Sequence, residues 1–275
     1  MKRVIAVVAM LLWLAPSASA TPTLHSAGAF DYLTSFSSLT SGDVPLTVFC
    51  PPNTRVTGVG ASVADRKNRG ENRISTLDIQ PDDHGTVTFV LSRPPLVHPT
   101  ITVICMTEPL ANFLFYESSS IATSTSSTGN VTGCTAAGTV VGGGVTLDDN
   151  DHLILEASHP QPAVNFWAGR VEDTDATAHN MTVDAACFEP TPPHKIRIVQ
   201  NSTRVRPNHT ASVVAMCPSR FHVASGGTGN GPKVLMSRPV DGSDRDRAPD
   251  DGWAVRGFNG QTKTQRLVAS AVCFR

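Results

Sequence analysis

The chain has little charge and few aromatic residues: charged residues make up 16% of its 275 residues, and aromatic residues make up 6%. Beyond the N-terminus, no apolar run approaches the roughly 20 residues that a membrane helix needs. No long stretch shows the 3.6-residue period of an amphipathic helix either. These absences argue against a membrane-spanning protein and against a helical one.

Several motifs of catalysis and cofactor binding are missing as well. The glycine run 142–144 is not followed by the lysine of a phosphate-binding loop. The sequence has no Gly-x-Ser-x-Gly, no His-Glu-x-x-His and no Cys-x-x-Cys, which are local signatures of hydrolases and metal or thiol sites. We therefore expect no cofactor and no enzymatic activity. The alternative is a hydrolase whose Ser, His and Asp meet only in the fold.

The N-terminus has the pattern of a secretory signal peptide. Lys2 and Arg3 precede the apolar stretch 4–14, and Ala18-Ser19-Ala20 matches the small-x-small rule for cleavage. Cleavage after Ala20 leaves 20 basic against 23 acidic side chains, a net charge of −3. That balance gives no electrostatic footprint for nucleic acid or an anionic membrane. We expect a secreted protein that neither binds nucleic acid nor inserts into a membrane.

The residues that are abundant are typical of a β-protein with many turns. The chain contains 21 Gly and 20 Pro, and Val, Thr and Ala alternate in stretches such as "GTVTFVLS" and "LVASAVC". Alternation with a period of two places one side of a strand inward. Small antiparallel β-structures are therefore expected.

One unit is repeated three times along the chain. Cys50, Cys134 and Cys217 stand 84 and 83 residues apart, and each is followed six residues later by a valine and after eight to ten residues by a glycine-rich triplet. Each copy ends on an alternating strand that leads into a second cysteine. The second cysteines are Cys105, Cys187 and Cys273, and the prolines that we align between the two cysteines are Pro81, Pro160 and Pro239. Glycine at a fixed strand position predicts a bulge or a close backbone crossing.

The repeats divide the chain and favour one disulfide pairing. We assign a signal peptide to 1–20, a lead to 21–27, unit 1 to 28–110, unit 2 to 111–193 and unit 3 to 194–275. An even number of cysteines in an exported chain implies disulfides. The simplest pairing is within units: Cys50–Cys105, Cys134–Cys187 and Cys217–Cys273. A link between neighbouring units, such as Cys105–Cys134, is the alternative.

The predicted fold is all-β, with three tandem antiparallel β-sandwich-like repeats of about 83 residues that each hold one disulfide. The alternative is a pseudo-threefold β-prism, with three sheets around one axis.

The motif order in each unit resembles a disulfide repeat of bacterial, especially actinobacterial, secreted proteins. Unit 3 carries most of the pattern in Cys217-Pro218, Gly226-Gly227, Ser237-Arg238-Pro239 and Gly252-Trp253. Unit 1 departs most, since it lacks the tryptophan and the serine of Ser-x-Pro. That family is largely uncharacterised, so the resemblance implies a secreted β-repeat protein and no particular activity.

A few side chains are candidates for binding. Trp167 and Trp253 could stack on sugar rings or pack in the core. Asp148, Asn150 and His152 alternate in "DDNDH" and could place calcium or zinc ligands on one strand face, or form a solvated turn. The basic side chains of Lys195, Arg197, Arg204 and Arg206 also alternate, and could bind an acidic polymer or protect a strand edge from pairing.

These features predict a secreted, non-enzymatic β-repeat protein that binds a glycan, a cell-wall polymer or an extracellular protein. Apart from the hydrolase, the alternative is a protease inhibitor that presents a loop such as Asp241–Gly252.

Overall fold

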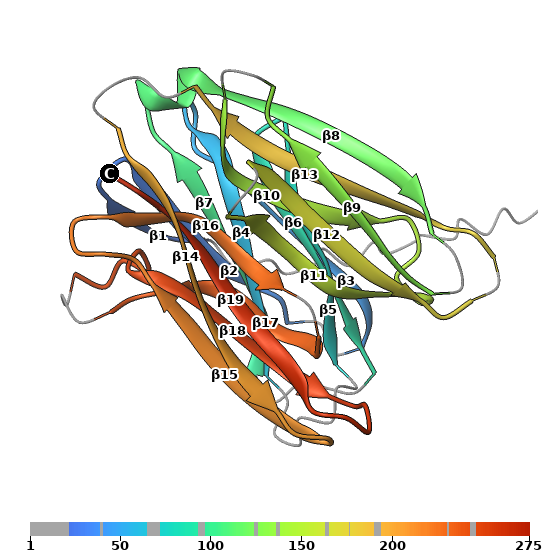
Figure 1. The fold of residues 1–275 in the computed structure, drawn as a ribbon. Helices are drawn as coiled ribbons and strands as arrows, with labels where there is room; N and C mark the ends of the chain where they lie inside the picture. Colours follow the sequence, from blue (N-terminus) through green and yellow to red (C-terminus); the bar gives the residue numbers. More distant parts are fainter. Residues whose placement is uncertain are drawn as a thin grey trace, which may run out of the picture.

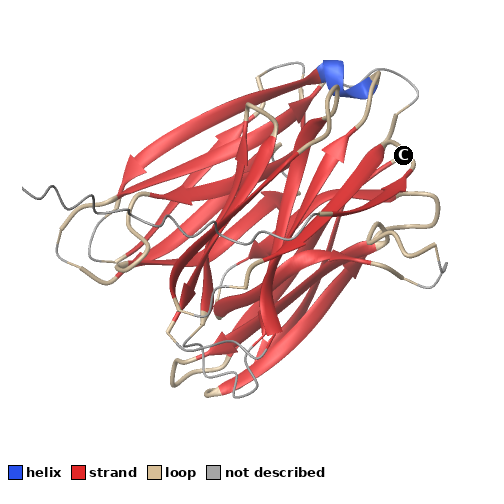
Figure 2. Cartoon of the chain, turned by 180° about the vertical axis from the view of Figure 1, so that it is seen from behind, coloured by secondary structure: helices blue, strands red, loops and turns tan. Residues whose placement is uncertain are grey.

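The computed structural model describes residues 22–38, 41–64, 72–92, 97–123, 126–135, 138–162, 165–175, 177–189, 194–229, 231–242 and 246–275. The predicted signal peptide lies outside these ranges. Strands dominate the described chain, and its one helix is a short 3-10 turn, η1 (Leu110–Phe113) (Figure 2). Nowhere in this part of the chain is there a helix long and apolar enough to span a membrane. The all-β prediction is confirmed.

Within the described ranges, each unit contributes six strands. Unit 1 follows the lead strand β1 (Thr23–Ala27) with β2 (Phe30–Phe36), β3 (Gly42–Phe49), β4 (Arg55–Ala64), β5 (Arg73–Gln80), β6 (His84–Leu91) and β7 (Val97–Met106). Unit 2 contains β8 (Leu114–Ala122), β9 (Ser127–Gly133), β10 (Thr139–Leu147), β11 (Leu153–Gln161), β12 (Phe166–Asp173) and β13 (Asn180–Phe188). Unit 3 contains β14 (Ile196–Val205), β15 (His209–Met216), β16 (His222–Gly229), β17 (Lys233–Val240), β18 (Gly252–Asn259) and β19 (Gln265–Phe274).

The strands form three antiparallel sheets, and every sheet is shared between two units. The strand orders are β1-β2-β7-β4-β17-β18-β15, β3-β6-β5-β10-β13-β8 and β14-β19-β16-β11-β12-β9. In each unit the first, third and sixth strands join one sheet, while the second, fourth and fifth join the next. Figure 1 shows the result for unit 3, whose orange and red strands divide between two sheets.

The three-part architecture is therefore that of the pseudo-threefold alternative, and the units are not separate sandwiches. The third strand of each unit pairs with the fourth strand of another: β10 with β5, β16 with β11 and β4 with β17. A three-stranded half-sheet on its own would expose a row of unpaired backbone N–H and C=O groups at this edge. Pairing with a second half-sheet satisfies those groups.

Close packing at the centre explains the glycine-rich triplets. A Cβ atom at Gly142 in β10 would collide with the carbonyl oxygen of Thr57 in β4. Two side chains tie the same region together. The Thr57 hydroxyl donates to the carbonyl of Ala224, at 2.8 Å, and the Ser225 hydroxyl donates to the carbonyl of Val141, at 2.5 Å. The glycines are therefore part of the framework, as the sequence predicts.

Each unit holds one disulfide, and the pairing within units is confirmed. The bridges join Cys50 to Cys105, Cys134 to Cys187 and Cys217 to Cys273. In every unit the bridge ties the residues just before the third strand to the end of the sixth strand. A staple across a loop of 53 to 56 residues stabilises each unit mainly by restricting its unfolded state.

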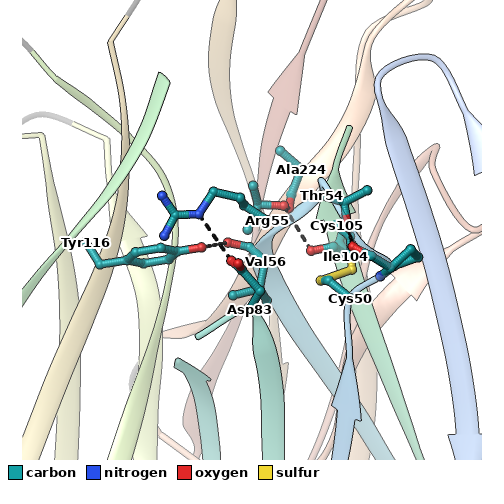
Figure 3. The surroundings of a disulfide bond; sticks show 11 residues. Cys50, Thr54, Arg55, Val56, Asp83, Ile104, Cys105, Tyr116 and Ala224 are labelled. Carbon is teal, nitrogen blue, oxygen red and sulfur yellow. Dashed lines mark hydrogen bonds and ion pairs between the residues drawn. A yellow bond between two sulfur atoms is a disulfide. The ribbon is translucent and has the colours of Figure 1, made fainter. Parts of the chain in front are cut away.

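Next to the first bridge, a tyrosine joins two units (Figure 3). The Tyr116 hydroxyl of unit 2 donates to the carbonyl of Val56 in unit 1, at 2.8 Å. The guanidinium of Arg55 lies 4.9 Å from the centre of the Tyr116 ring and forms an ion pair with Asp83 at 3.2 Å. This cluster holds the start of β8 against β4.

The same tyrosine contact occurs at a second junction and is missing at the third. Tyr32 of unit 1 donates to the carbonyl of Val223 in unit 3, at 2.8 Å. Strand register places Ile198 of unit 3 at the equivalent position, because all three residues pair with the residue that precedes the unit's second cysteine. A cavity of about 340 Å³ lies there, lined by Ile198 and Val140 among others.

Candidate functional site

The first, third and fifth strands of each unit end on the side opposite the disulfides, and the second, fourth and sixth strands begin there. We call this the loop end. In unit 2 it includes residues 148–152, 174–175 and 177–179, and in unit 3 it includes 206–208 and 260–264. The framework is shared, whereas the side chains at the loop end differ between units.

The loop end of unit 2 brings two histidines and an aspartate together. Oδ2 of Asp149 lies 2.8 Å from Nδ1 of His152 and 3.4 Å from Nδ1 of His179. The two imidazole rings stack with centroids 5.7 Å apart and planes 10° apart. Oδ2 of Asp175 lies 3.6 Å from Nε2 of His179. The donor atoms of Asp149, His152 and His179 all lie within 4.8 Å of one another, which is close enough to hold one metal ion.

The sequence-based metal set is corrected by this geometry. Of Asp148, Asn150 and His152, only His152 belongs to the cluster. Asp148 instead accepts the backbone N–H and the side-chain amide of Asn180, both at 2.8 Å. Asn150 accepts the Ser75 hydroxyl at 2.7 Å. Residues 148–152 form a turn rather than a strand, so alternation does not apply.

A different spacing would have identified part of the site. In a turn, residues three apart approach each other, and Asp149 and His152 have this spacing. The partner His179 is 27 residues further on, and only the pairing of the strands brings it here. Oδ1 of Asp149 accepts the backbone N–H of Asp151 at 2.8 Å and of His152 at 3.3 Å, which leaves Oδ2 toward the histidines.

Asp149 and His152 stabilise each other's charged form. The hydrogen bond to His152 lowers the pKa of Asp149 below its ordinary value. The same bond, with weaker attraction from Asp175 and Asp151, raises the pKa of His152.

The loop end of unit 3 carries a cationic groove. A cavity of about 940 Å³ is lined by Ser202, Thr203, Arg204, Arg206, Thr264, Gln265 and Arg266. We call it the arginine groove. All three arginines are exposed, and within the described part of the chain no acidic side chain lines the groove. The sequence did not identify Arg266 as a candidate binding residue, because only the strand pairing shows that it lies opposite Arg204.

Arg204 and Arg266 are direct partners across β14 and β19. Directly opposed residues have Cβ atoms about 5 Å apart, and like charges in that position are destabilising. Among the described residues, neither guanidinium forms an ion pair. Lys195 lies just before β14 and Arg197 near its start, and the guanidinium of Arg197 lies over the ring of Phe221, 5.4 Å from its centre. The four basic residues expected on one strand face therefore lie in two separate places, with only Arg204 and Arg206 in the arginine groove.

The two tryptophans are framework residues and not ligand-stacking residues. Trp167 is 1% exposed and Trp253 is fully buried. The indole N–H of Trp167 donates to the Ser158 hydroxyl at 3.0 Å, and that of Trp253 donates to the Ser237 hydroxyl at 2.9 Å. Because neither ring reaches the surface, sugar stacking by these residues is ruled out in the folded chain.

Two further groups bear on the hydrolase alternative. His222 is hydrogen-bonded through Nδ1 to the buried carboxylate of Asp250, the arrangement of a histidine and its orienting acid. However, a Cβ atom at Gly28 would lie 2.9 Å from Nε2 of His222. The nitrogen that would activate a nucleophile thus lies against backbone.

Comparison with known proteins supplies no assignment: no protein-family model matches the chain, and no curated protein is similar to it.

Proposed function

We propose that the protein is an exported binding protein that recognises an anionic polymer of a cell surface or cell wall through the arginine groove. The observation that carries the proposal is the direct opposition of Arg204 and Arg266 across two strands. An anion between the two guanidinium groups would replace repulsion by two sets of charge-assisted hydrogen bonds.

The size and the lining of the groove suit a ligand that carries hydroxyl groups as well as negative charge. A second cavity of about 290 Å³ shares Gln265 with the arginine groove but is lined by Glu156 and Glu172, so an anionic ligand would stay on the side of the arginines. The hydroxyls of Ser202, Thr203 and Thr264 add hydrogen-bonding groups that suit a polyol or a sugar. Cavities of about 300–1,000 Å³ are the usual size for ligand sites.

Export is supported by the three disulfides, because such bonds persist in oxidising compartments. The predicted signal peptide and the resemblance to a secreted bacterial disulfide repeat agree with it. The loop Asp241–Gly252, proposed for an inhibitor, is less suitable for insertion into a protease. Its described part folds back, with Ala248 and Asp250 buried and Asp251 accepting the backbone N–H of Gly242.

The proposal is tested by binding to immobilised polymers. We expect the oxidised protein to bind poly(glycerol phosphate) or a polyuronate, and not neutral polymers of the same length. Because exposed charges are screened by salt, binding should weaken steeply between low and physiological ionic strength. Comparing the two anionic polymers distinguishes phosphate from carboxylate.

Variants localise the binding. Arg204→Ala combined with Arg266→Ala should weaken binding at least tenfold, whereas the conservative Arg266→Lys should retain charge but lose bidentate contacts. Arg238→Ala is the matched control, since Arg238 is exposed on another sheet. Equal binding by the double variant, or binding only to neutral polymers or to a protein, would overturn the proposal.

A further inference from the structure

The loop end of unit 2 is chemically unlike the arginine groove. We propose that Asp149, His152 and His179 bind one zinc ion, with Asp175 beside them. This inference does not depend on the proposed polymer binding, because the two sites share no residue.

The distances between the donor atoms fit a tetrahedral ion. Zinc binds nitrogen and carboxylate oxygen at about 2.0–2.1 Å, which makes the edges of the tetrahedron roughly 3.3–3.4 Å. Oδ2 of Asp149 is 2.8 Å from Nδ1 of His152 and 3.4 Å from Nδ1 of His179. Nδ1 of His152 is 3.8 Å from Oδ2 of Asp175. These separations lie on both sides of the ideal edge, so small side-chain rotations would admit the ion.

His179 has a feature of a metal ligand beyond its position. Its side chain is only 13% exposed, and within the described chain its buried Nε2 atom has no hydrogen-bond partner. Oδ2 of Asp175 is 3.6 Å from that atom. With zinc on Nδ1, Nε2 carries the proton and points at a carboxylate. Ligating histidines usually donate their second N–H to such a group.

The donor set selects among metals. Two imidazoles and one or two carboxylates suit zinc, whereas calcium takes six to eight oxygen ligands and magnesium near-octahedral oxygen. Three protein ligands leave a fourth position for water, while Asp175 faces the second ring nitrogen of His179. An ion there would tie the turn 148–152 to the turn that ends at His179.

The experiment uses the full, oxidised protein after treatment with a chelator. Titration with ZnCl₂, followed by calorimetry, should give one equivalent bound, and the melting temperature should rise because the ion binds the folded state. Co²⁺ should give the strong visible absorption of tetrahedral nitrogen and oxygen coordination.

Matched variants separate this site from others. His179→Gln should weaken zinc binding at least 100-fold and abolish the Co²⁺ spectrum, while the metal-free melting temperature checks the fold. Two controls should bind zinc as the wild type does. Asp148→Asn tests the set expected from alternation, and His209→Ala removes an exposed histidine of unit 3.

The outcomes decide the proposal. Loss in His179→Gln and in Asp149→Asn, with both controls unchanged, supports it. Zinc binding that is unaffected by His179→Gln, no zinc binding by the wild type, or a preference for Ca²⁺ over Zn²⁺ overturns it.

Discussion

Two buried carboxyl groups face each other where unit 1 meets unit 2, and we expect them to make stability fall as pH rises. Asp78 lies in β5 and Asp184 in β13, on either side of Gly144 in β10. They are 4% and 7% exposed. Burial first, and the neighbouring Asp184 second, raise the pKa of Asp78 to about 7. Burial also raises the pKa of Asp184.

The sign follows from the preference for the neutral form. The unfolded chain ionises Asp78 near its ordinary pKa of about 3.9, whereas the folded chain keeps it protonated up to about pH 7. Stability is therefore lost progressively as pH rises through this window. A shift of about three pKa units corresponds to about 4 kcal/mol in total, and more than half of it falls between pH 5 and pH 8.

Asp78→Asn should remove the part of this loss that comes from Asp78. The asparagine can still accept from the Gln80 side-chain amide, the present partner of Asp78, and can donate to Asp184. Urea unfolding gives the free energy of unfolding of the oxidised wild type and of the variant at pH 5 and at pH 8. The effect is the change between the two pH values in the wild type minus the same change in the variant. His222, whose pKa its bond to Asp250 raises, and His159, whose pKa burial lowers, contribute equally to both proteins and cancel. The reasoning is refuted if both proteins show the same pH dependence, or if the variant is the less stable of the two at pH 8.

Three other predictions concern stability and use the same urea assay. Trp253→Ala should lower the free energy of unfolding by about 3–5 kcal/mol, with polymer affinity per folded molecule unchanged; a selective loss of affinity would restore a binding role. Replacing Cys217 and Cys273 together by serine should cost about 4 kcal/mol, because the bridge closes a 56-residue loop; a cost near zero would contradict this. Ile198→Tyr should raise stability by about 1 kcal/mol, since the ring enters the cavity and its hydroxyl can reach the carbonyl of Val140; destabilisation would show that the three junctions are not equivalent.

The framework was the predictable part of this molecule, because it depends on local spacing. Val56, Val140 and Val223, each six residues after a cysteine, are all buried. The cysteine spacing likewise predicted the three bridges. The buried valines and the cysteines recur in all three units because a buried strand position and a covalent link each restrict the residue type directly.

The way in which three strands of one unit complete a sheet with strands of another unit could not be predicted in the same way. Alternation along a strand says which side chains turn inward, and it is identical whether the half-sheet closes on its own unit or pairs with another. Only contacts between residues far apart in the sequence, such as Thr57 and Ala224, distinguish these two arrangements. For the same reason the sequence showed only part of the histidine cluster and of the arginine cluster, since His179 and Arg266 reach their partners through strand pairing.

Strand register also corrects one alignment of the units. Pro160 and Pro239 pair with Trp167 and Trp253 in the neighbouring strands. The residue of unit 1 at that place is Ile79, which pairs with Gly85. Pro81 lies two residues further on, in the turn after β5. The alignment of the units on proline therefore placed this strand of unit 1 two positions out of register.

The corrected register shows that unit 1 lacks the tryptophan because several positions changed together. In units 2 and 3 the tryptophan packs over Gly143 or Gly226 and donates to a buried serine. Unit 1 has Gly85 in place of the tryptophan and Val59 in place of the glycine, and a Cβ atom at Gly85 would lie 3.2 Å from a Val59 methyl.

The serine changes for a related reason. Where units 2 and 3 have Ser158 and Ser237, unit 1 has Leu77, which is 2% exposed. With no indole N–H to satisfy, a buried hydroxyl there would lack its partner and cost free energy. Volume and hydrogen bonding thus change together, which is the behaviour of a core position and not of a ligand site. The residues free to acquire different chemistry in each unit are those at the loop end, where one unit places two histidines and another places three arginines.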